Sequence, residues 1–180
     1  MNKISFENKK KKDVIYFRNL LIKINKNDLN LLKNFSKNNK DKKSRYCIHK
    51  SKKSKLHEMI IYHKRGYYIR PHSHPYSPES MHLIKGEVDI VIFDKKQKVS
   101  DIIKMGNYES GKIFYYRMNK ELTHTLVIKS PYVIFHETSL GPFKKKNSKF
   151  ASWSPIKRNS IFLKDLKSKI KNYEDSLKKK

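Results

Sequence analysis

Cysteine is nearly absent from this 180-residue chain, which has Cys47 alone. A single thiol excludes an intramolecular disulfide framework, so we expect a reducing compartment. Long hydrophobic runs are missing as well, and no stretch approaches the roughly 20 apolar residues of a membrane helix. The amino-terminal stretch is charged but has no apolar centre, because Arg18 and Lys23 interrupt its best run. We therefore expect a cytoplasmic protein without a signal peptide or a transmembrane segment.

Acidic residues are scarce. Sixteen Asp and Glu stand against 43 Lys and Arg, which gives a formal net charge of +27. Such a charge is typical of proteins that bind nucleic acids or anionic membranes. Lysine outnumbers arginine, however, asparagine and isoleucine are frequent, and no aromatic-basic RNA-binding motif is present, so an AT-rich genome is the favoured explanation. We expect no nucleic-acid partner, although the positive field would attract a small anionic ligand.

The length predicts one domain with tails. Residues 1–12 are rich in lysine and have little to bury, which predicts a disordered basic arm. Residues 13–155 form the expected domain, and residues 156–180 are expected to form a lysine-rich carboxyl-terminal helix. The apolar seam of that helix recurs at spacings of three and four and consists of Leu163, Leu166, Ile170, Tyr173 and Leu177.

The expected domain is mainly β. A strand is expected within residues 14–24, a short helix follows Asn27 or Asp28, and residues 36–44 read as a loop. Short runs rich in branched and aromatic residues then alternate with polar turns, which favours a barrel or sandwich. These runs are YCIH, LHEMIIYH, YYIRPH, MHLIKGEVDIVIF, IFYYRM, HTLVI and YVIFHET.

A set of candidate metal ligands lies between Gly66 and Gly86. His72 and His74 are two residues apart, so on a strand both imidazoles would point to the same face. A turn separates His74 from Glu79, and it can bring the Glu79 carboxylate back to the point at which the two imidazoles are directed. A His-x-His pair alone is weak evidence, because histidines are common on strand surfaces.

The whole string resembles the first motif of the cupin family. It reads Gly, five residues, His-x-His, four residues, Glu, six residues, Gly. The second cupin motif supplies one more histidine, for which His124 is the candidate, although Asn119 and Glu121 replace the usual Pro and Gly ahead of it. The resemblance implies a single jelly-roll β-barrel that holds one divalent transition metal, Fe, Mn, Ni, Co or Zn.

Further strings are similar to the WbuC-type cupins found with surface-polysaccharide (O-antigen) biosynthesis. They are SRYCIH, LHEMIIYH, PHSHPYSPESMHLIKGEVDIVIFD, FHETSLGPF and FASWSP, and they span residues 44–155. That family has no established reaction. The resemblance implies a metal-dependent enzyme acting on a nucleotide sugar or polysaccharide precursor, or alternatively a non-catalytic cupin that binds a small glycan or metal and regulates a partner. A homodimer is expected because cupins are often dimers.

Several polar residues near the motif are candidate substrate-binding groups for an anionic, sugar-derived small molecule. They are Arg45, Tyr68, Arg70, His82 and Arg117. Arginine can bind a carboxylate or phosphate through two hydrogen bonds, but it is equally suited to a structural ion pair. His82 lies three residues after Glu79, so on a strand it should face away from that carboxylate. The sequence assigns no catalytic residue.

Overall fold

A computed structural model describes residues 3–37, 39–119, 121–144 and 147–179 of the chain. Strands dominate it, with two α-helices and one 3₁₀ helix among the described residues, so the mainly β prediction is confirmed. None of the helices in these ranges has the length and apolar character needed to cross a membrane.

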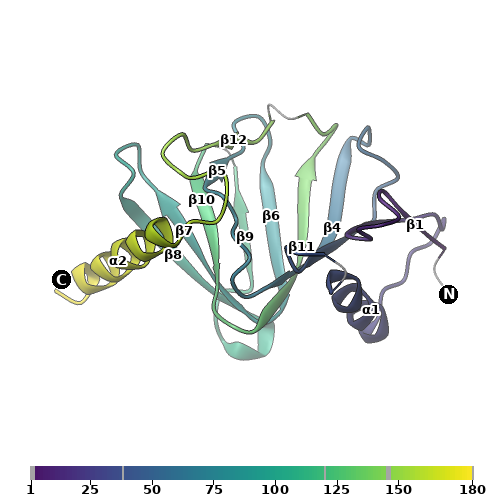
Figure 1. Ribbon diagram of the computed structural model, residues 1–180, viewed down its shortest axis with the longest axis horizontal. Helices are drawn as coiled ribbons and strands as arrows, with labels where there is room; N and C mark the ends of the chain where they lie inside the picture. Colours follow the sequence, from purple (N-terminus) through teal and green to yellow (C-terminus); the bar gives the residue numbers. More distant parts are fainter. Residues whose placement is uncertain (1–2, 38, 120, 145–146, 180) are drawn as a thin grey trace.

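The strands form two sheets that face each other (Figure 1). The first sheet contains, in spatial order, β1 (Ile4–Phe6), β2 (Val14–Phe17), β3 (Lys43–Cys47), β4 (Leu56–Lys64), β11 (Tyr132–Leu140), β6 (Glu79–Lys85) and β9 (Tyr115–Met118). The second contains β12 (Lys149–Phe150), β5 (His72–Ser73), β10 (Thr123–Ile128), β7 (Glu87–Phe93) and β8 (Val99–Gly106). A 3₁₀ turn, η1 (Tyr108–Ser110), connects β8 to β9.

The strand order is that of a jelly roll. The eight strands from β4 to β11 divide into β4-β11-β6-β9 in one layer and β5-β10-β7-β8 in the other, which is the double Greek-key arrangement. Within the described residues the two layers share no continuous hydrogen-bonded ladder, and only an isolated bridge joins Met105 to Ile113. The expected barrel is therefore two facing sheets that do not close.

The main core fills the space between the layers. Alternate residues of each strand point into this space, as period-two patterning predicts. In β7, Val88, Ile90 and Ile92 belong to this core, whereas Val91 and Phe93 face the outside of the sheet. The layers therefore enclose an apolar interior, and a group of polar side chains lies at one end of it.

Helix α1 (Lys26–Ser36) covers part of the outer face of the first sheet, where it contacts β3 and β4 (Figure 1). Asn25 caps its first turn, and Asp28 completes a reciprocal capping box. Leu32 is fully buried in the cluster that the helix forms with the sheet. The sequence predicted this helix to within a few residues.

The amino-terminal segment differs from the expected disordered arm. Residues 4–6 form β1, which pairs antiparallel with β2. The reason is apolar contact, because Ile4 and Phe6 pack on the α1 cluster and the Phe6 ring meets the Phe35 ring edge-on at 5.3 Å. Residues 1–2 of the expected arm lie outside the described ranges. The strand expected within residues 14–24 ends at Phe17.

Helix α2 (Ser160–Leu177) lies against β7 and β8 at the opposite end of the molecule (Figure 1). Its buried residues Leu166 and Ile170 pack with Val91 and Phe93. The apolar seam that was expected on this helix therefore packs on the second sheet of the same chain. Lys180, the last residue of the expected helix, lies outside the described ranges.

Candidate metal centre

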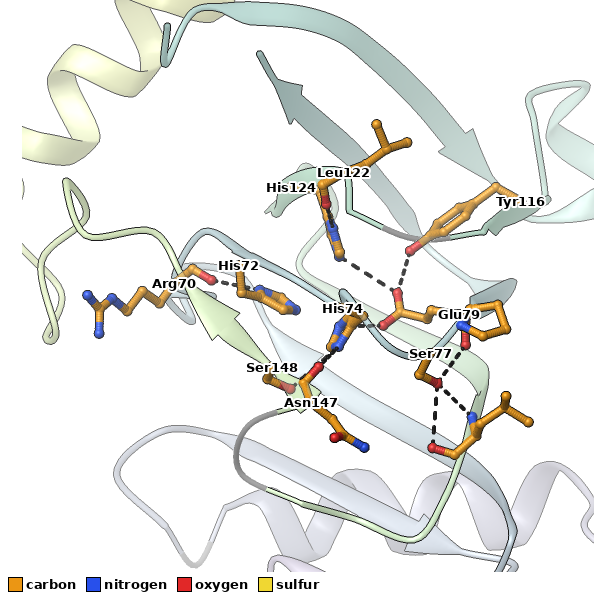
Figure 2. A network of polar contacts seen from close by, with 12 residues as sticks. Arg70, His72, His74, Ser77, Glu79, Tyr116, Leu122, His124, Asn147 and Ser148 are labelled. Carbon is orange, nitrogen blue, oxygen red and sulfur yellow. Dashed lines mark hydrogen bonds and ion pairs between the residues drawn. The ribbon is translucent and has the colours of Figure 1, made fainter. Parts of the chain in front are cut away.

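Four candidate ligands meet at one point between the sheets. His72 lies on β5 and is paired directly with His124 on β10, while Glu79 begins β6 in the facing sheet. His74 follows β5 by one residue. One ligand atom from each of the four lies within 4.8 Å of the others, and Figure 2 shows the side chains converging. We refer to these four residues as the His/Glu cluster.

The turn between His74 and Glu79 is held by Ser77. Its hydroxyl accepts a hydrogen bond from the backbone N–H of Leu140 at 2.9 Å and donates one to the carbonyl of Pro78 at 3.1 Å (Figure 2). This anchorage ties the turn to the end of β11. The five-residue step from His74 to Glu79 therefore returns the carboxylate to the imidazoles.

Backbone carbonyl groups orient all three imidazoles. The Nδ1 atom of His72 lies 2.8 Å from the carbonyl oxygen of Arg70, and that of His124 lies 3.0 Å from the carbonyl oxygen of Leu122. The Nδ1 atom of His74 lies 3.2 Å from the carbonyl oxygen of Asn147. A carbonyl oxygen only accepts, so each Nδ1 carries the proton of the neutral ring and leaves the Nε2 lone pair free. Metal-binding histidines are oriented in this way.

The Glu79 carboxylate is buried among these Nε2 atoms. Its Oε2 lies 2.9 Å from His74 Nε2 and its Oε1 lies 3.7 Å from His124 Nε2. Tyr116 donates a hydrogen bond to Oε1 at 3.0 Å. The buried Nε2 of His124 has no hydrogen-bond partner among the described residues. Lone pairs of neutral imidazoles and a carboxylate that face one another in a buried space fit a bound cation.

The environment shifts the pKa values of the cluster. Burial and the neighbouring His124 lower the pKa of His72 to about 4. Burial opposes the charge of Glu79, but the hydrogen bond to His74 and the nearby imidazoles outweigh it and lower the Glu79 pKa. Burial likewise opposes protonation of His74, yet the Glu79 hydrogen bond raises its pKa. A metal ion would bind the neutral His74 imidazole, so it would compete with the proton that the Glu79 carboxylate favours there.

A cavity of about 360 Å³ adjoins the His/Glu cluster. Glu137 on β11 and His63 on β4 line it, and neither residue was expected at the site from the sequence. Burial, followed by the negative charge of Glu79, raises the pKa of Glu137 to about 8. The signal for Glu137 was the alternation of β11, since Val133 and Phe135 point into the core and position 137 has the same phase.

The five substrate-binding candidates separate into different places. Arg45 lines the cavity together with members of the His/Glu cluster. Arg70 instead donates from Nε to the hydroxyl of Ser154 at 3.0 Å, and its guanidinium extends away from the imidazoles in Figure 2. Tyr68 donates to the carbonyl of Pro155 at 2.9 Å. These two residues secure the segment that follows β12.

The other two candidates lie on the outer face of the first sheet. His82 is exposed on β6, opposite in phase to the buried Glu79, as predicted. Arg117 is exposed on β9 and donates to the hydroxyl of Ser80 at 3.3 Å, whereas its neighbour Tyr116 points inward to the cluster. Neither His82 nor Arg117 lines the cavity.

Residues 24–105 match the family model described as a domain of unknown function, DUF6016. No curated protein matches the chain in sequence. Among solved structures, the chain is similar to a protein from Shewanella oneidensis, with 9% identity, a TM-score of 0.47 and coverage of 56% of this chain and 64% of that one. It is also similar to KdgF from Halomonas sp., with 12% identity, a TM-score of 0.44 and coverage of 58% and 82%. The oxalate decarboxylase from Bacillus subtilis matches with 20% identity and a TM-score of 0.44, over 53% of this chain and 24% of that one.

Proposed function

We propose that this chain is a cupin-type metal-binding protein that holds one divalent transition-metal ion in the His/Glu cluster. The carbonyl groups that accept from all three Nδ1 atoms carry the proposal, because they direct three Nε2 lone pairs at one buried carboxylate. Three imidazoles and one carboxylate suit Fe, Mn, Co, Ni or Zn. Such an ion would supply Lewis-acid or, for a redox-active metal, electron-transfer chemistry.

We further propose that the loaded site is enzymatic and acts on a small anionic molecule, with a nucleotide sugar or surface-polysaccharide precursor of the WbuC-type context as the first substrates to test. Glu137 favours an enzyme over a non-catalytic binding module. Its carboxyl group lines the same cavity as the cluster, and burial raises its pKa, which brings proton exchange closer to neutral pH. A cytoplasmic homodimer remains part of this proposal.

Elemental analysis of untagged protein tests the metal site. We expect about one equivalent of a transition metal in the wild type and its loss in the His72→Ala, His74→Ala double variant, because two of four ligands are removed. The matched control is His82→Ala, which removes an exposed imidazole from the outer face of the facing sheet. It should retain the metal.

Two results would contradict the proposal. One is a wild type that takes up no metal even after reconstitution with each of the five ions. The other is equal metal content in the wild type and the double variant, which would place the ion elsewhere. Circular dichroism of each variant establishes that the sheets have formed.

A further inference from the structure

Arg45 stands out among the cavity-lining residues because its guanidinium forms no close ion pair, although it lies near enough to Glu137 to lower the pKa of that carboxyl group. Its Nε atom is buried and has no hydrogen-bond partner within the described ranges. No carboxylate of a described residue lies within ion-pair distance of its guanidinium. Asp13 contacts Arg45 through the backbone, where its carbonyl oxygen accepts from the Arg45 N–H at 2.8 Å. A partly buried guanidinium without an anionic partner is costly unless a ligand or solvent satisfies it.

A second cation lies on the same side of the cavity. Lys43 is two residues before Arg45 on β3, so both side chains face the interior of the jelly roll. The Nζ of Lys43 donates to the hydroxyl of Tyr67 at 2.9 Å and lies 3.9 Å from the exposed carboxylate of Asp41. Asp13 and Glu137 also line the cavity. The β3 side of the cavity therefore presents two cationic groups to a ligand.

The sheet separates Arg45 from Glu79 both across and along its strands. The row of paired residues that starts at Arg45 on β3 crosses β4 and β11 and reaches Leu83 on β6, four residues from Glu79. The separation is therefore about 14 Å across three strand spacings and about 13 Å along β6. Both side chains cover part of it and both line one cavity of about 360 Å³, so a ligand that contacts both ends must be extended and small.

We propose that the cavity binds a small organic acid with an anionic group at each end, one on the metal ion of the His/Glu cluster and the other on Arg45. The metal end carries a carboxylate and a neighbouring hydroxyl or carbonyl oxygen. The far end carries a carboxylate or a phosphate, both of which match the guanidinium. This inference deepens the proposed function and depends on it, because it requires metal in the cluster.

Two pairs of small-molecule probes test the two ends of the proposed ligand separately. Lactate and malate share a hydroxy-acid end, and malate adds a second carboxylate. Glycerate and 3-phosphoglycerate differ likewise by a phosphate. Calorimetric titration of the metal-loaded wild type should show, in at least one pair, that the probe with the second anionic group binds at least about tenfold more tightly than its partner, the effect of one charge-assisted hydrogen-bonded contact. The pair with the larger difference identifies the far group as carboxylate or phosphate.

Arg45→Met should abolish this preference while leaving metal content and lactate affinity unchanged, which also establishes that the variant is folded. Arg45→Lys should keep part of the preference, because it keeps the charge but loses the planar fork. Arg117→Met is the matched control, since that exposed arginine lies on the outer face, and it should behave as the wild type.

Equal affinity for both members of both pairs in the wild type would overturn the inference and leave the metal site intact. So would a preference that persists in Arg45→Met. Failure of the wild type to bind metal would overturn the proposed function, and the inference with it.

Discussion

At the residue scale, His63 links the cavity to the pH dependence of stability. Burial, followed by the positive charges of Lys43 and Arg45, lowers its pKa to about 3 from an ordinary value of 6.5. Between these values the unfolded chain binds a proton that the folded chain does not bind. The free energy of unfolding should therefore fall as the pH falls from about 6.5 towards 3, by up to about 1.4 kcal/mol per pH unit from this group.

The variant His63→Gln isolates this contribution. Urea unfolding of metal-free wild type and variant at pH 7, 6 and 5 should show a shallower loss of stability in the variant. Glu137 acts in the opposite direction, since its raised pKa means that the folded chain takes up a proton as the pH falls through about 8. That effect is common to both proteins and cancels in the comparison. Parallel curves would show that His63 is protonated equally in both states.

Spacing along the chain predicted the residues of the His/Glu cluster, because a His-x-His pair on one strand face and a glutamate across a turn are local features. The participation of Glu137 and His63 depends on which strands become neighbours. Glu137 reaches the cavity because β11 pairs with both β4 and β6, a long-range arrangement. Local periodicity predicts that such a residue points inward. It does not predict which wall of the cavity the residue lines.

At the element scale, Gly86 fixes the tight connection between β6 and β7. Its φ is +94°, and a Cβ atom there would lie 2.3 Å from the carbonyl oxygen of Tyr132 and 2.5 Å from the hydroxyl of Ser130. We expect Gly86→Ala to lower the free energy of unfolding by about 2–4 kcal/mol, from the left-handed backbone together with the overlap. Chemical denaturation measures this loss.

Gly66→Ala provides the control. Gly66 has a similar φ of +84°, but a Cβ atom there would meet nothing within 4 Å. Gly66→Ala should lower the free energy of unfolding by the backbone contribution alone, about 1–2 kcal/mol. Equal losses at the two positions would show that the close approach of Tyr132 relaxes without cost.

Elements with a clear apolar period were predictable, and those stabilised by their neighbours were not. Helix α1 follows from the helical spacing of its leucines, and α2 from its seam. Strand β8 was missed because its exposed and partly buried residues do not alternate. Pairing with β7 along its length and coverage by α2 hold β8 in place. Strand β5 was expected to be longer than His72–Ser73, since residues 67–71 read as a strand but form no ladder.

At the scale of the whole molecule, the excess of lysine acts on the fold through self-repulsion. The net charge of +27 is spread over the surface of one domain with 16 acidic residues to offset it. Mutual repulsion of like charges destabilises a compact state, and salt screens it over a Debye length of about 10 Å at 0.1 M. Local ion pairs such as Lys104 with Glu174 and Lys112 with Glu87 act in the opposite sense, because salt weakens them.

We expect repulsion to dominate, so that raising NaCl from about 0.02 to 0.2 M increases the Tm by about 2–4 °C, the effect of about 1 kcal/mol in a chain of this size. Differential scanning calorimetry measures the shift. The variant Lys167→Glu, Lys171→Glu changes two exposed residues one turn apart on α2 and lowers the net charge by four, from +27 to +23. Its Tm at low salt should exceed that of the wild type and respond less to NaCl. A wild-type Tm that falls with added salt would instead mean that the surface ion pairs outweigh the repulsion, and that the lysines are placed where they stabilise the fold.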